Sequence, residues 1–331
     1  MLEYPLALIF VAALVSWFVW QLKFQKLKGV NEAMLLICLA VPVTLGWKLA
    51  GQGHDVIFRA RNFYGALRVT EIPLRAVQHT LLNGETVHGT QSFFPGLSHL
   101  GTAYYGPQGG GFAILQHPAY SSRALRVGCI GLGAGTLSVY GRTNDLYRFF
   151  EINPQVIDVA GRTNLFTYLA DCQAQLQLAP GDARKTLVAE VARGEPRYDV
   201  LAVDAYSGDA IPIHLATREA FALYLQRLAP DGILAVHTSN WHIDLLPLCK
   251  AIGRDLQLNL LGVISEPQPA RLTTAAQWVF MTRQPLPMAG QSIPHARQVE
   301  WSRVRDLLRA PTDETGSLLE LVQFSTRASR Q

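Results

Sequence analysis

Two long apolar stretches occupy the start of the chain. Leu6 to Trp20 and Ala33 to Trp47 contain no charged residue, and a helix that crosses a bilayer needs about 20 predominantly apolar residues. With their flanks, the two runs predict transmembrane helices at 5–23 and 32–50. Two other interpretations stay open: both runs are buried helices of a soluble domain, or the second, which Pro42 interrupts, is a re-entrant segment.

Alternating polar and apolar positions follow this membrane segment (1–52). The stretch from Asp55 to Ile72 is rich in aromatic and β-branched residues and has a turn signal at Tyr64-Gly65, which predicts a β-hairpin. An Asn-Gly dipeptide at 83–84 predicts a second hairpin, because this pair adopts the tight turn that joins antiparallel strands. We therefore expect a small antiparallel β-domain at 53–120, with a further strand at Phe112 to Gln116.

From Arg126 onward, apolar strands alternate with helices. This alternation predicts a doubly wound, mostly parallel α/β sheet, whose ligands lie at the carboxyl ends of the strands. We assign 121–290 to this Rossmann-like domain and 291–331 to a C-terminal helix or tail. The predicted strands are Val127–Leu132, Leu146–Glu151, Gln175–Leu178, Tyr198–Asp204, Gly232–Thr238, Leu258–Ser265 and Gln277–Thr282. The predicted helices are Pro154–Thr163, Arg184–Ala192, Ala216–Leu228 and Asp244–Asp255.

The first strand of this domain ends in a glycine turn. Gly131, Gly133 and Gly135 let the backbone bend tightly and come close to a ligand. Glu151 follows about 20 residues after the turn begins, at a strand end, where an acid suits a ribose hydroxyl pair. The pattern predicts a nucleotide-type pocket. The alternative is a tight turn that only packs helix on strand, with Glu151 as an exposed loop acid.

Other polar side chains stand at the ends of the following strands. Asp182 can bond an adenine amino group, or it can cap the helix that begins at Arg184. Asp204 is a candidate general base or cation-binding carboxylate, and otherwise a helix or turn cap. A lone histidine such as His237, at the end of an apolar strand, is more often a packed residue than a catalyst.

Composition narrows the chemistry. The 331 residues are 49% hydrophobic and carry a net charge of +4, and their arginines form no stripe, so we expect no nucleic-acid partner. The four cysteines lie far apart without a C-x-x-C pair, which predicts neither disulfides nor a zinc site, and we expect no metal. No G-x-S-x-G or H-E-x-x-H motif occurs, so nothing supports a hydrolase or a metalloprotease.

Several blocks of the sequence resemble one family. We find similarity to the spermidine synthase-like (polyamine aminopropyltransferase) branch of the class I S-adenosylmethionine-dependent transferases in GCIGLGAGT, FFEINPQVIDVA, LAPGDARKTL and YDVLAVDAYSGDAIPIHLATREAF. Similarity to the membrane-fused bacterial members is found in RNFYGALRV, LLNGETVHGTQ, AYYG and VHTSNWHIDLLP. The match covers roughly residues 56–283. The resemblance implies the class I methyltransferase type of Rossmann-like fold and a shortened membrane region, either a reduced version or a fragment.

The resemblance also implies a set of functional residues. Asp204 matches the aspartate that accepts a proton from the attacking amine in aminopropyltransferases. The residues matched to donor binding are Gly131, Gly133 and Gly135 for the backbone, Glu151 for the ribose, and Asp182 with Ala183 for the adenine. The candidate acceptor-binding residues are Tyr206, Asp209, His237 and Gln91. The implied co-substrate is decarboxylated S-adenosylmethionine or S-adenosylmethionine, with no permanently bound cofactor, and the implied partners are a small polyamine-like acceptor, a membrane and a second copy in a homodimer.

The chain departs from this family on the acceptor side. Spermidine synthases have an acid inside the glycine turn, where this chain has Ala134, and an aspartate three residues after the catalytic one, where it has Ser207. Asp209 is the nearest substitute, two positions further on. The family's Tyr-His-Glu segment is not recognisable after the second hairpin. Since a diamine is a dication, fewer acidic partners weaken its binding.

We expect a membrane-anchored aminopropyltransferase that moves an aminopropyl group from decarboxylated S-adenosylmethionine to a diamine, with Asp204 as the base. Two alternatives stay open: a methyltransferase on the same scaffold, and a non-catalytic membrane protein that senses an adenosyl ligand or is associated with transport. A nicotinamide oxidoreductase is weaker, because the third glycine follows the second by two residues instead of three.

The charges beside the apolar runs give conflicting orientations. Lysines between the runs favour a cytoplasmic loop, which would place the rest of the chain outside the cell, whereas basic residues after the second run favour a cytoplasmic face. Because the expected donor is a cytoplasmic metabolite, we expect a bacterial inner-membrane protein with its catalytic domain on the cytoplasmic face.

Overall fold

The computed structural model describes residues 55–72, 77–206, 211–240, 243–286 and 289–315, with the isolated residues 10, 13, 17 and 321. The chain divides into two compact units, Met1–Val56 and Ile57–Gln331, and the second contains almost all of the described residues. Apart from the isolated positions, the two predicted membrane helices lie outside the described residues. Within the described residues, no helix is long and apolar enough to cross a membrane.

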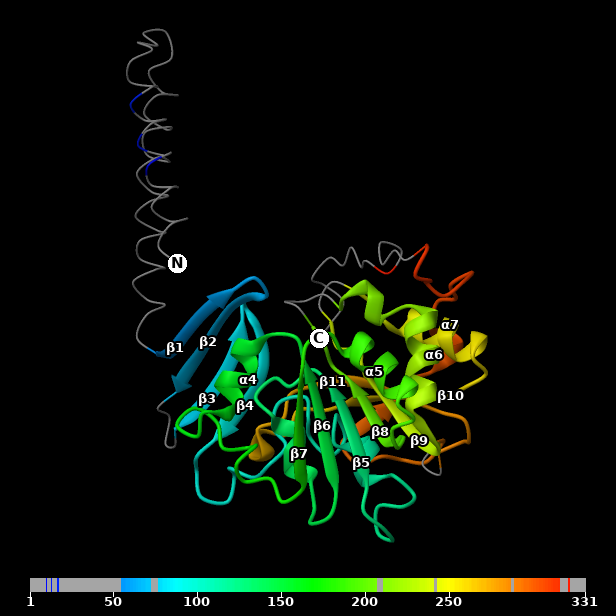
Figure 1. Cartoon of the computed structure of the whole chain (residues 1–331), viewed down its shortest axis with the longest axis horizontal. Coiled ribbons are helices and arrows are strands. Elements are labelled where there is room, and N and C mark those ends of the chain that lie inside the picture. Colours follow the sequence, from blue (N-terminus) through cyan, green and yellow to red (C-terminus); the bar gives the residue numbers. More distant parts are fainter. Residues whose placement is uncertain are drawn as a thin grey trace. The chain divides into compact units, whose positions relative to one another are not determined.

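The second unit begins with a small antiparallel sheet. Its strands follow one another in the order β1-β2-β3-β4 (Figure 1). The second predicted hairpin is present: β3 and β4 pair antiparallel, and Gly84 adopts a positive φ of 62° in the turn between them. The strand bounds are β1 Val56–Asn62, β2 Gly65–Ile72, β3 Gln78–Asn83 and β4 Thr86–Ser92.

An eight-stranded sheet forms the main body, in the order β12-β10-β11-β9-β8-β5-β6-β7. The strands from β9 to β7 in this order are parallel, whereas β10, β11 and β12 run antiparallel to their neighbours. The predicted doubly wound α/β architecture is confirmed, with a mixed sheet. The strand bounds are β5 Arg126–Ile130, β6 Leu146–Glu151, β7 Gln175–Pro180, β8 Tyr198–Val203, β9 Leu228–His237, β10 Asn259–Ser265, β11 Ala276–Thr282 and β12 Ala296–Gln298.

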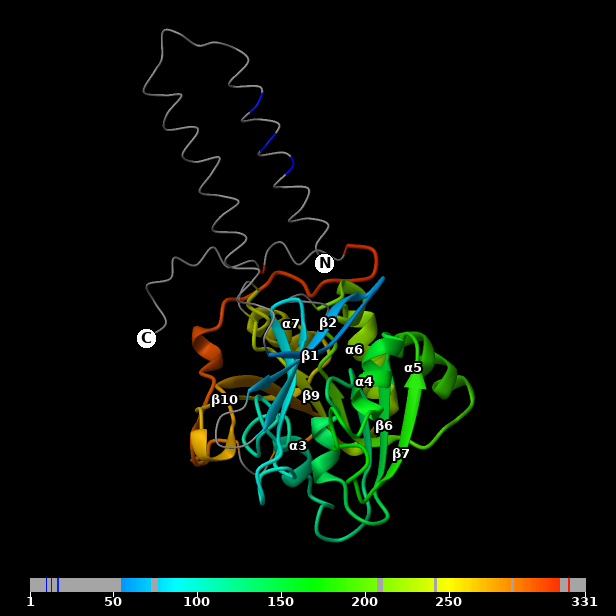
Figure 2. The same cartoon turned by 90° about the vertical axis from the view of Figure 1, so that its left-hand side faces the viewer.

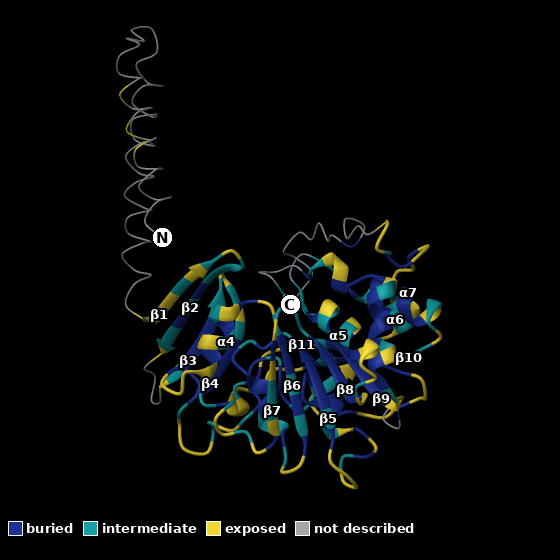
Figure 3. Ribbon diagram, in the orientation of Figure 1, coloured by how far each residue is buried: buried dark blue, intermediate teal, exposed yellow. Residues whose placement is uncertain are grey.

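Side chains that alternate along the central strands build two separate cores. Leu201 and Val203 of β8 pack with α5, α6 and α7, whereas Val200 and Ala202 pack with α3, η1 and α4. Every residue of β8 is buried, as expected for a strand covered on both faces (Figure 3). The helices thus lie on both sides of the sheet (Figures 1 and 2). The bounds are α3 Phe112–Leu115, η1 Thr136–Tyr140, α4 Pro154–Gly161, α5 Ala183–Ala192, α6 Arg218–Arg227 and α7 Leu246–Asp255.

Two predicted elements differ in the structure. The strand expected at Phe112–Gln116 is the short helix α3, closed by hydrogen bonds such as Leu115 N–H to Gly111 O. A run of four apolar residues has no periodicity that separates a strand from a helix. The expected C-terminal helix or tail contributes, in its described part, the edge strand β12 and the 3₁₀ turn η4 Trp301–Arg303.

A buried ion cluster joins α5, α6 and the sheet. The Glu190 carboxylate of α5, fully buried, accepts a hydrogen bond from Arg227 Nε of α6 at 3.1 Å. It also accepts one from the Tyr198 hydroxyl of β8 at 3.0 Å, and Arg148 Nε of β6 lies 3.0 Å from it. Arg227 donates further to the carbonyl oxygens of Glu195 and Pro196. Burial of these charges is therefore compensated by several partners at once.

We predict that Glu190→Gln lowers the free energy of unfolding by about 3–5 kcal/mol, because it leaves the Arg227 guanidinium buried without its counter-ion. Urea unfolding of the full chain measures this. The matched control is Glu85→Gln, which breaks an ion pair with Arg68 on a side chain that is 86% exposed, and which we expect to cost at most about 1 kcal/mol. Equal losses in the two variants would contradict the prediction.

Candidate functional site

A pocket lies at the carboxyl ends of β5, β6, β7 and β8, where the small sheet approaches the large one. Its empty space, part of it open to solvent, is about 1060 Å³. The residues that line it come from the glycine turn, the ends of β6 and β7, the end of β8, the small sheet and the segment before α6. They include Gly131, Gly133, Glu151, Asp182, Ala183, Asp204, Tyr206, Tyr105 and His214.

The glycine turn connects the large sheet to the small one. Gly131 and Gly133 have positive φ values of 100° and 55°. A Cβ on Gly131 would collide with the backbone oxygen of Asp204, and one on Gly133 with the backbone oxygen of His88 in β4. Ala134 N–H donates to the same His88 oxygen at 3.1 Å. Close packing therefore explains these two glycines as well as ligand approach does.

The third glycine lies outside the lining of the pocket. Gly135 has a φ of 85° and stands before η1, a 3₁₀ helix of five residues. A Cβ at this position would meet the Leu169 side chain. Its positive φ thus serves the entry into η1.

Glu151 lines the pocket from the end of β6. Its Oε2 accepts from Leu132 N–H of the glycine turn at 3.0 Å, and its Oε1 accepts from Asn153 N–H at 2.8 Å. Burial raises the pKa of Glu151, and the backbone N–H groups of Asn153 and Leu132 oppose that rise. A carboxylate accepts about four hydrogen bonds, so further acceptor capacity remains for a ligand.

Asp182 and Ala183 reach the pocket at the start of α5. Asp182 Oδ1 accepts from Lys185 N–H at 2.9 Å, which is the geometry of a helix N-cap. Its Oδ2 lies 3.1 Å from Nε2 of His214. The capping interpretation is thus realised, and the side chain lines the pocket as well. His214, which also lines it, was absent from the predicted set because nothing in its local sequence marks it.

Asp204 lies just after β8, and its side chain is only 7% exposed. Oδ1 lies 2.7 Å from His237 Nδ1, and Oδ2 accepts from the Tyr105 hydroxyl at 2.6 Å. Burial and then the Asp204 charge raise the pKa of Tyr105 well above its usual range. The phenol therefore stays protonated, and its O–H donates the hydrogen bond to Asp204. The buried carboxylate therefore has two hydrogen-bond donors.

His237 lies behind Asp204, and it is not among the residues that line the pocket. Its ring is stacked between Tyr104, at 4.4 Å between centroids, and Trp278, at 4.7 Å. Tyr206 does line the pocket, and its hydroxyl donates to the backbone oxygen of His237 at 2.6 Å. Of the candidate acceptor residues, Tyr206 thus contacts the cavity and His237 contacts Asp204.

The structure does not bring Gln91 to the pocket. The residue is fully buried, and its amide nitrogen donates to Ser98 O at 3.0 Å and to Thr167 Oγ1 at 2.8 Å. Its amide oxygen accepts from Thr167 N–H at 2.8 Å. These bonds join β4 to the segment before β7. Asp209 lies outside the described residues.

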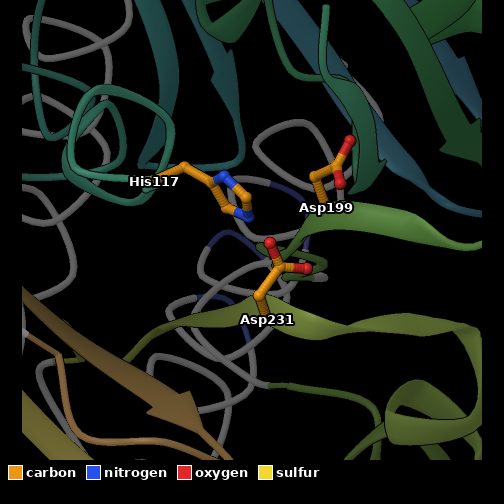
Figure 4. A group of neighbouring side chains, drawn as sticks. All are labelled: His117, Asp199 and Asp231. Carbon is orange, nitrogen blue, oxygen red and sulfur yellow. The ribbon is translucent and has the colours of Figure 1, made fainter. Parts of the chain in front are cut away.

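A second polar cluster lies at the opposite ends of the strands. The ring of His117 faces the carboxylates of Asp199 and Asp231, and one potential ligand atom from each lies within 4.8 Å of the others (Figure 4). His117 Nδ1 accepts from Ala119 N–H at 3.1 Å, so the neutral ring carries its proton on Nε2. Burial lowers the pKa of His117.

This proton position argues against a metal ion in the second cluster. A histidine that binds a metal usually donates from its other ring nitrogen, whereas the other nitrogen of His117 accepts. Arg123 Nη2 already lies 2.7 Å from the Asp199 carboxylate and neutralises part of its charge. We therefore interpret the cluster as an ion pair of Arg123 and Asp199 beside a buried histidine.

The chain was compared with protein-family models and with known proteins. No protein-family model matches the chain. It is 26% identical over 189 residues to a probable polyamine aminopropyl transferase of Bifidobacterium longum, covering 55% of this chain. It is 32% identical over 124 residues to a polyamine aminopropyltransferase of Vibrio vulnificus, covering 36% of this chain. The matched regions span 37% and 39% of the length of these relatives.

Solved structures include one that matches most of the length of both chains. The crystal structure of a probable spermidine synthase from Corynebacterium glutamicum aligns with a TM-score of 0.52 at 16% identity, over 75% of this chain and 92% of that one. This likeness shows a shared fold. The sequence matches confirm the resemblance to polyamine aminopropyltransferases.

The glycine turn gives a direct test of the site's geometry. We predict that Gly133→Ala destabilises the chain more than Gly84→Ala, although both glycines have a positive φ of about 60°. Each variant pays about 1–2 kcal/mol for a left-handed alanine, but only at Gly133 would the new Cβ meet a backbone oxygen; at Gly84 nothing lies within 4 Å. Urea unfolding compares the two, and a smaller loss of stability in Gly133→Ala would contradict the close packing of Gly133 against the His88 backbone oxygen.

Proposed function

We propose that this chain is an aminopropyltransferase that moves an aminopropyl group from decarboxylated S-adenosylmethionine to an amine acceptor of the polyamine type. One observation carries the proposal: a buried carboxylate, Asp204, shares a pocket with a glycine turn and with Glu151. The similarity to polyamine aminopropyltransferases supports it. No permanently bound cofactor is required.

The donor end of the pocket is the end built around Glu151. In this proposal Glu151 accepts hydrogen bonds from the ribose hydroxyls, using the lone pairs that Leu132 and Asn153 leave free. Asp182 and Ala183 border the adenine. The glycine turn leaves room for the remainder of the donor, because Gly131 and Gly133 carry no side chain.

The reaction needs alignment and the removal of a proton. The nitrogen of a neutral amine attacks the methylene carbon next to the sulfonium; the N–C bond forms, the C–S bond breaks, and its electron pair stays on sulfur, which leaves as a neutral thioether. The new ammonium gives one proton to a carboxylate oxygen of Asp204. Because the sulfonium already activates the carbon, positioning and a base are sufficient catalysis.

A methyltransferase on the same scaffold is the second candidate. Ala134 favours it, since the decarboxylated donor has a free ammonium that an acid in the glycine turn would bind, and this position is a fully buried alanine. A third candidate, an adenosyl-ligand sensor or transport-associated protein, requires binding without transfer. The first two candidates differ in the donor that they prefer. The third differs from both, because no group is transferred and Asp204 accepts no proton.

The expected result for Asp204→Asn is a fall of the transfer rate by about 10²–10⁴-fold, the usual contribution of a general base. Donor binding stays within about threefold of wild type, because the contacts of Glu151 and Asp182 remain. Spermidine formation from putrescine measures the rate, and calorimetry with both forms of the donor measures binding. Asp158→Asn is the control, since its carboxylate is exposed and pairs with Arg162 on the surface.

Three outcomes would contradict the proposed aminopropyltransferase function or the role of Asp204 in it. Tighter binding of intact S-adenosylmethionine than of the decarboxylated form would favour the methyltransferase. Binding of either donor without transfer to any diamine would favour the sensor. Full activity of Asp204→Asn would remove Asp204 from the chemistry.

We further propose that the chain is anchored in the bacterial inner membrane by the apolar runs of residues 1–52, with the catalytic domain facing the cytoplasm and two copies forming a homodimer. The uncharged length of both runs supports the anchor. The full chain is expected to stay in the membrane pellet after an alkaline carbonate wash and to be released by detergent. Recovery in the supernatant after that wash would contradict the anchor.

A further inference from the structure

The strongest feature that the proposed chemistry leaves unexplained is the histidine behind the base. β8 and β9 are parallel neighbours, and their register pairs Val203 with Val236, so the next residues, Asp204 and His237, stand side by side. His237 Nδ1 lies 2.7 Å from Asp204 Oδ1, and the histidine is 5% exposed. This pair is therefore fixed by the register of the sheet.

The ring of His237 is oriented from several sides. Tyr104 and Trp278 are stacked on its faces with interplanar angles of 18° and 20°. Trp278 lies opposite His237 in the register of β9 and β11, and its Nε1 donates to Tyr104 O at 3.0 Å. Tyr206 approaches the ring edge-on, at 5.4 Å between centroids. The imidazole thus has one orientation, in which Nδ1 faces the carboxylate.

The position of the proton follows from the partners of the two ring nitrogens. Nδ1 faces a carboxylate oxygen, which accepts only, so Nδ1 carries hydrogen. Nε2 is buried and has no hydrogen-bond partner within the described part of the chain. A second proton there would have no acceptor to bind it. The neutral Nδ1–H tautomer therefore suits this environment, and the pair of Asp204 and His237 then carries one net negative charge.

The hydrogen bonding of His237 is directed to one partner. Burying Nε2 without a partner costs about 1–3 kcal/mol, so the bond that Nδ1 makes is the polar interaction that the ring retains. Here the only hydrogen bond that the described residues give the ring leads to Asp204. A bond of this kind is how a third group orients a reacting group.

We propose that His237 is a positioning residue for Asp204: its Nδ1–H fixes the carboxylate in the orientation that accepts the amine proton, and the aromatic sandwich of Tyr104 and Trp278 fixes the histidine. This inference rests on the proposed function, in which Asp204 is the base. His237 itself neither contacts the acceptor nor stores its proton, which stays on Asp204 until solvent removes it. The hydrogen bond from His237 thus keeps the Asp204 carboxylate ionised and in a single orientation.

Three variants test the role. His237→Leu removes the donor and keeps an apolar side chain in the sandwich, and we expect kcat to fall about 10- to 100-fold with KM within about twofold, as when a partner that orients a reacting group is lost. His237→Asn places an amide N–H where Nδ1 was and should restore kcat to within about threefold of wild type. His117→Asn is the control: it also changes a buried histidine that faces carboxylates, but outside the pocket.

A spectroscopic measurement makes the test independent of turnover. In the full chain with ¹⁵N-labelled histidine, the His237 Nδ1 proton should give a low-field resonance that disappears in His237→Asn, persists in His117→Asn, and shifts upfield in Asp204→Asn. Absence of this resonance in the wild type, or its persistence in His237→Asn, would overturn the assignment of the tautomer.

The outcomes separate the two proposals. If the wild-type chain transfers no aminopropyl group, the proposed function fails, while the resonance still tests the pairing of His237 with Asp204. If Asp204→Asn is inactive but His237→Leu is fully active, only the positioning role fails. A folded His237→Asn without activity also overturns the role, because its amide would supply the hydrogen bond; it decides the question even if His237→Leu does not fold.

Discussion

The site depends on one buried carboxylate and on the donors that make its burial tolerable. An ionised carboxylate removed from water must be compensated by hydrogen bonds or opposite charge. For Asp204 the described compensation comes from two donors, the Tyr105 hydroxyl and His237 Nδ1. Neither donor needs to carry a charge, so the anion is stabilised without being neutralised. A base that is both buried and anionic can hold the attacking amine and then take the proton that the new ammonium gives up.

These donors come from parts of the chain that are far apart in sequence. Tyr105 belongs to the loop that follows the small sheet, and His237 ends β9. The glycine turn adds a third connection, since the missing side chain of Gly131 lets the backbone of Asp204 come close, and Ala134 bonds β4 through His88 O. The small sheet, the glycine turn and the end of β8 are therefore coupled. A shift of any one of them moves the wall of the pocket.

The sequence predicts the parts of this site that depend on strand ends and fails for those that depend on long-range packing. The carboxyl ends of parallel strands must meet at one edge, so Glu151, Asp182 and Asp204 come together once the strands are identified. Tyr105 reaches Asp204 across 99 positions of sequence, and no local pattern encodes such a contact. Gln91 lies at the end of a correctly predicted hairpin, yet its amide points to Thr167. Hairpin patterns predict pairing, but they do not predict which cavity a side chain reaches.

The order of the strands separates the two halves of the proposed chemistry. The first half is donor binding, and the second is acceptance of the proton. In the strand order β9-β8-β5-β6-β7, the chain runs outward from β5 to β7 and then returns to β8 on the other side of β5. Such a reversal opens a crevice at the end of the central strand, where the glycine turn lies. Glu151 and Asp182 stand on one side of it, and Asp204 with His237 on the other.

Any adenosyl-dependent enzyme of this fold needs the first half, so that half does not discriminate between aminopropyl and methyl transfer. The proton-accepting half bears on the acceptor instead, because a base with a fixed orientation is useful where the nucleophile must lose a proton to become the product, whichever group it receives. A buried carboxylate with two hydrogen-bond donors at this position therefore supports transfer to a nucleophile that loses a proton, such as an amine, and does not itself distinguish the aminopropyl group from the methyl group.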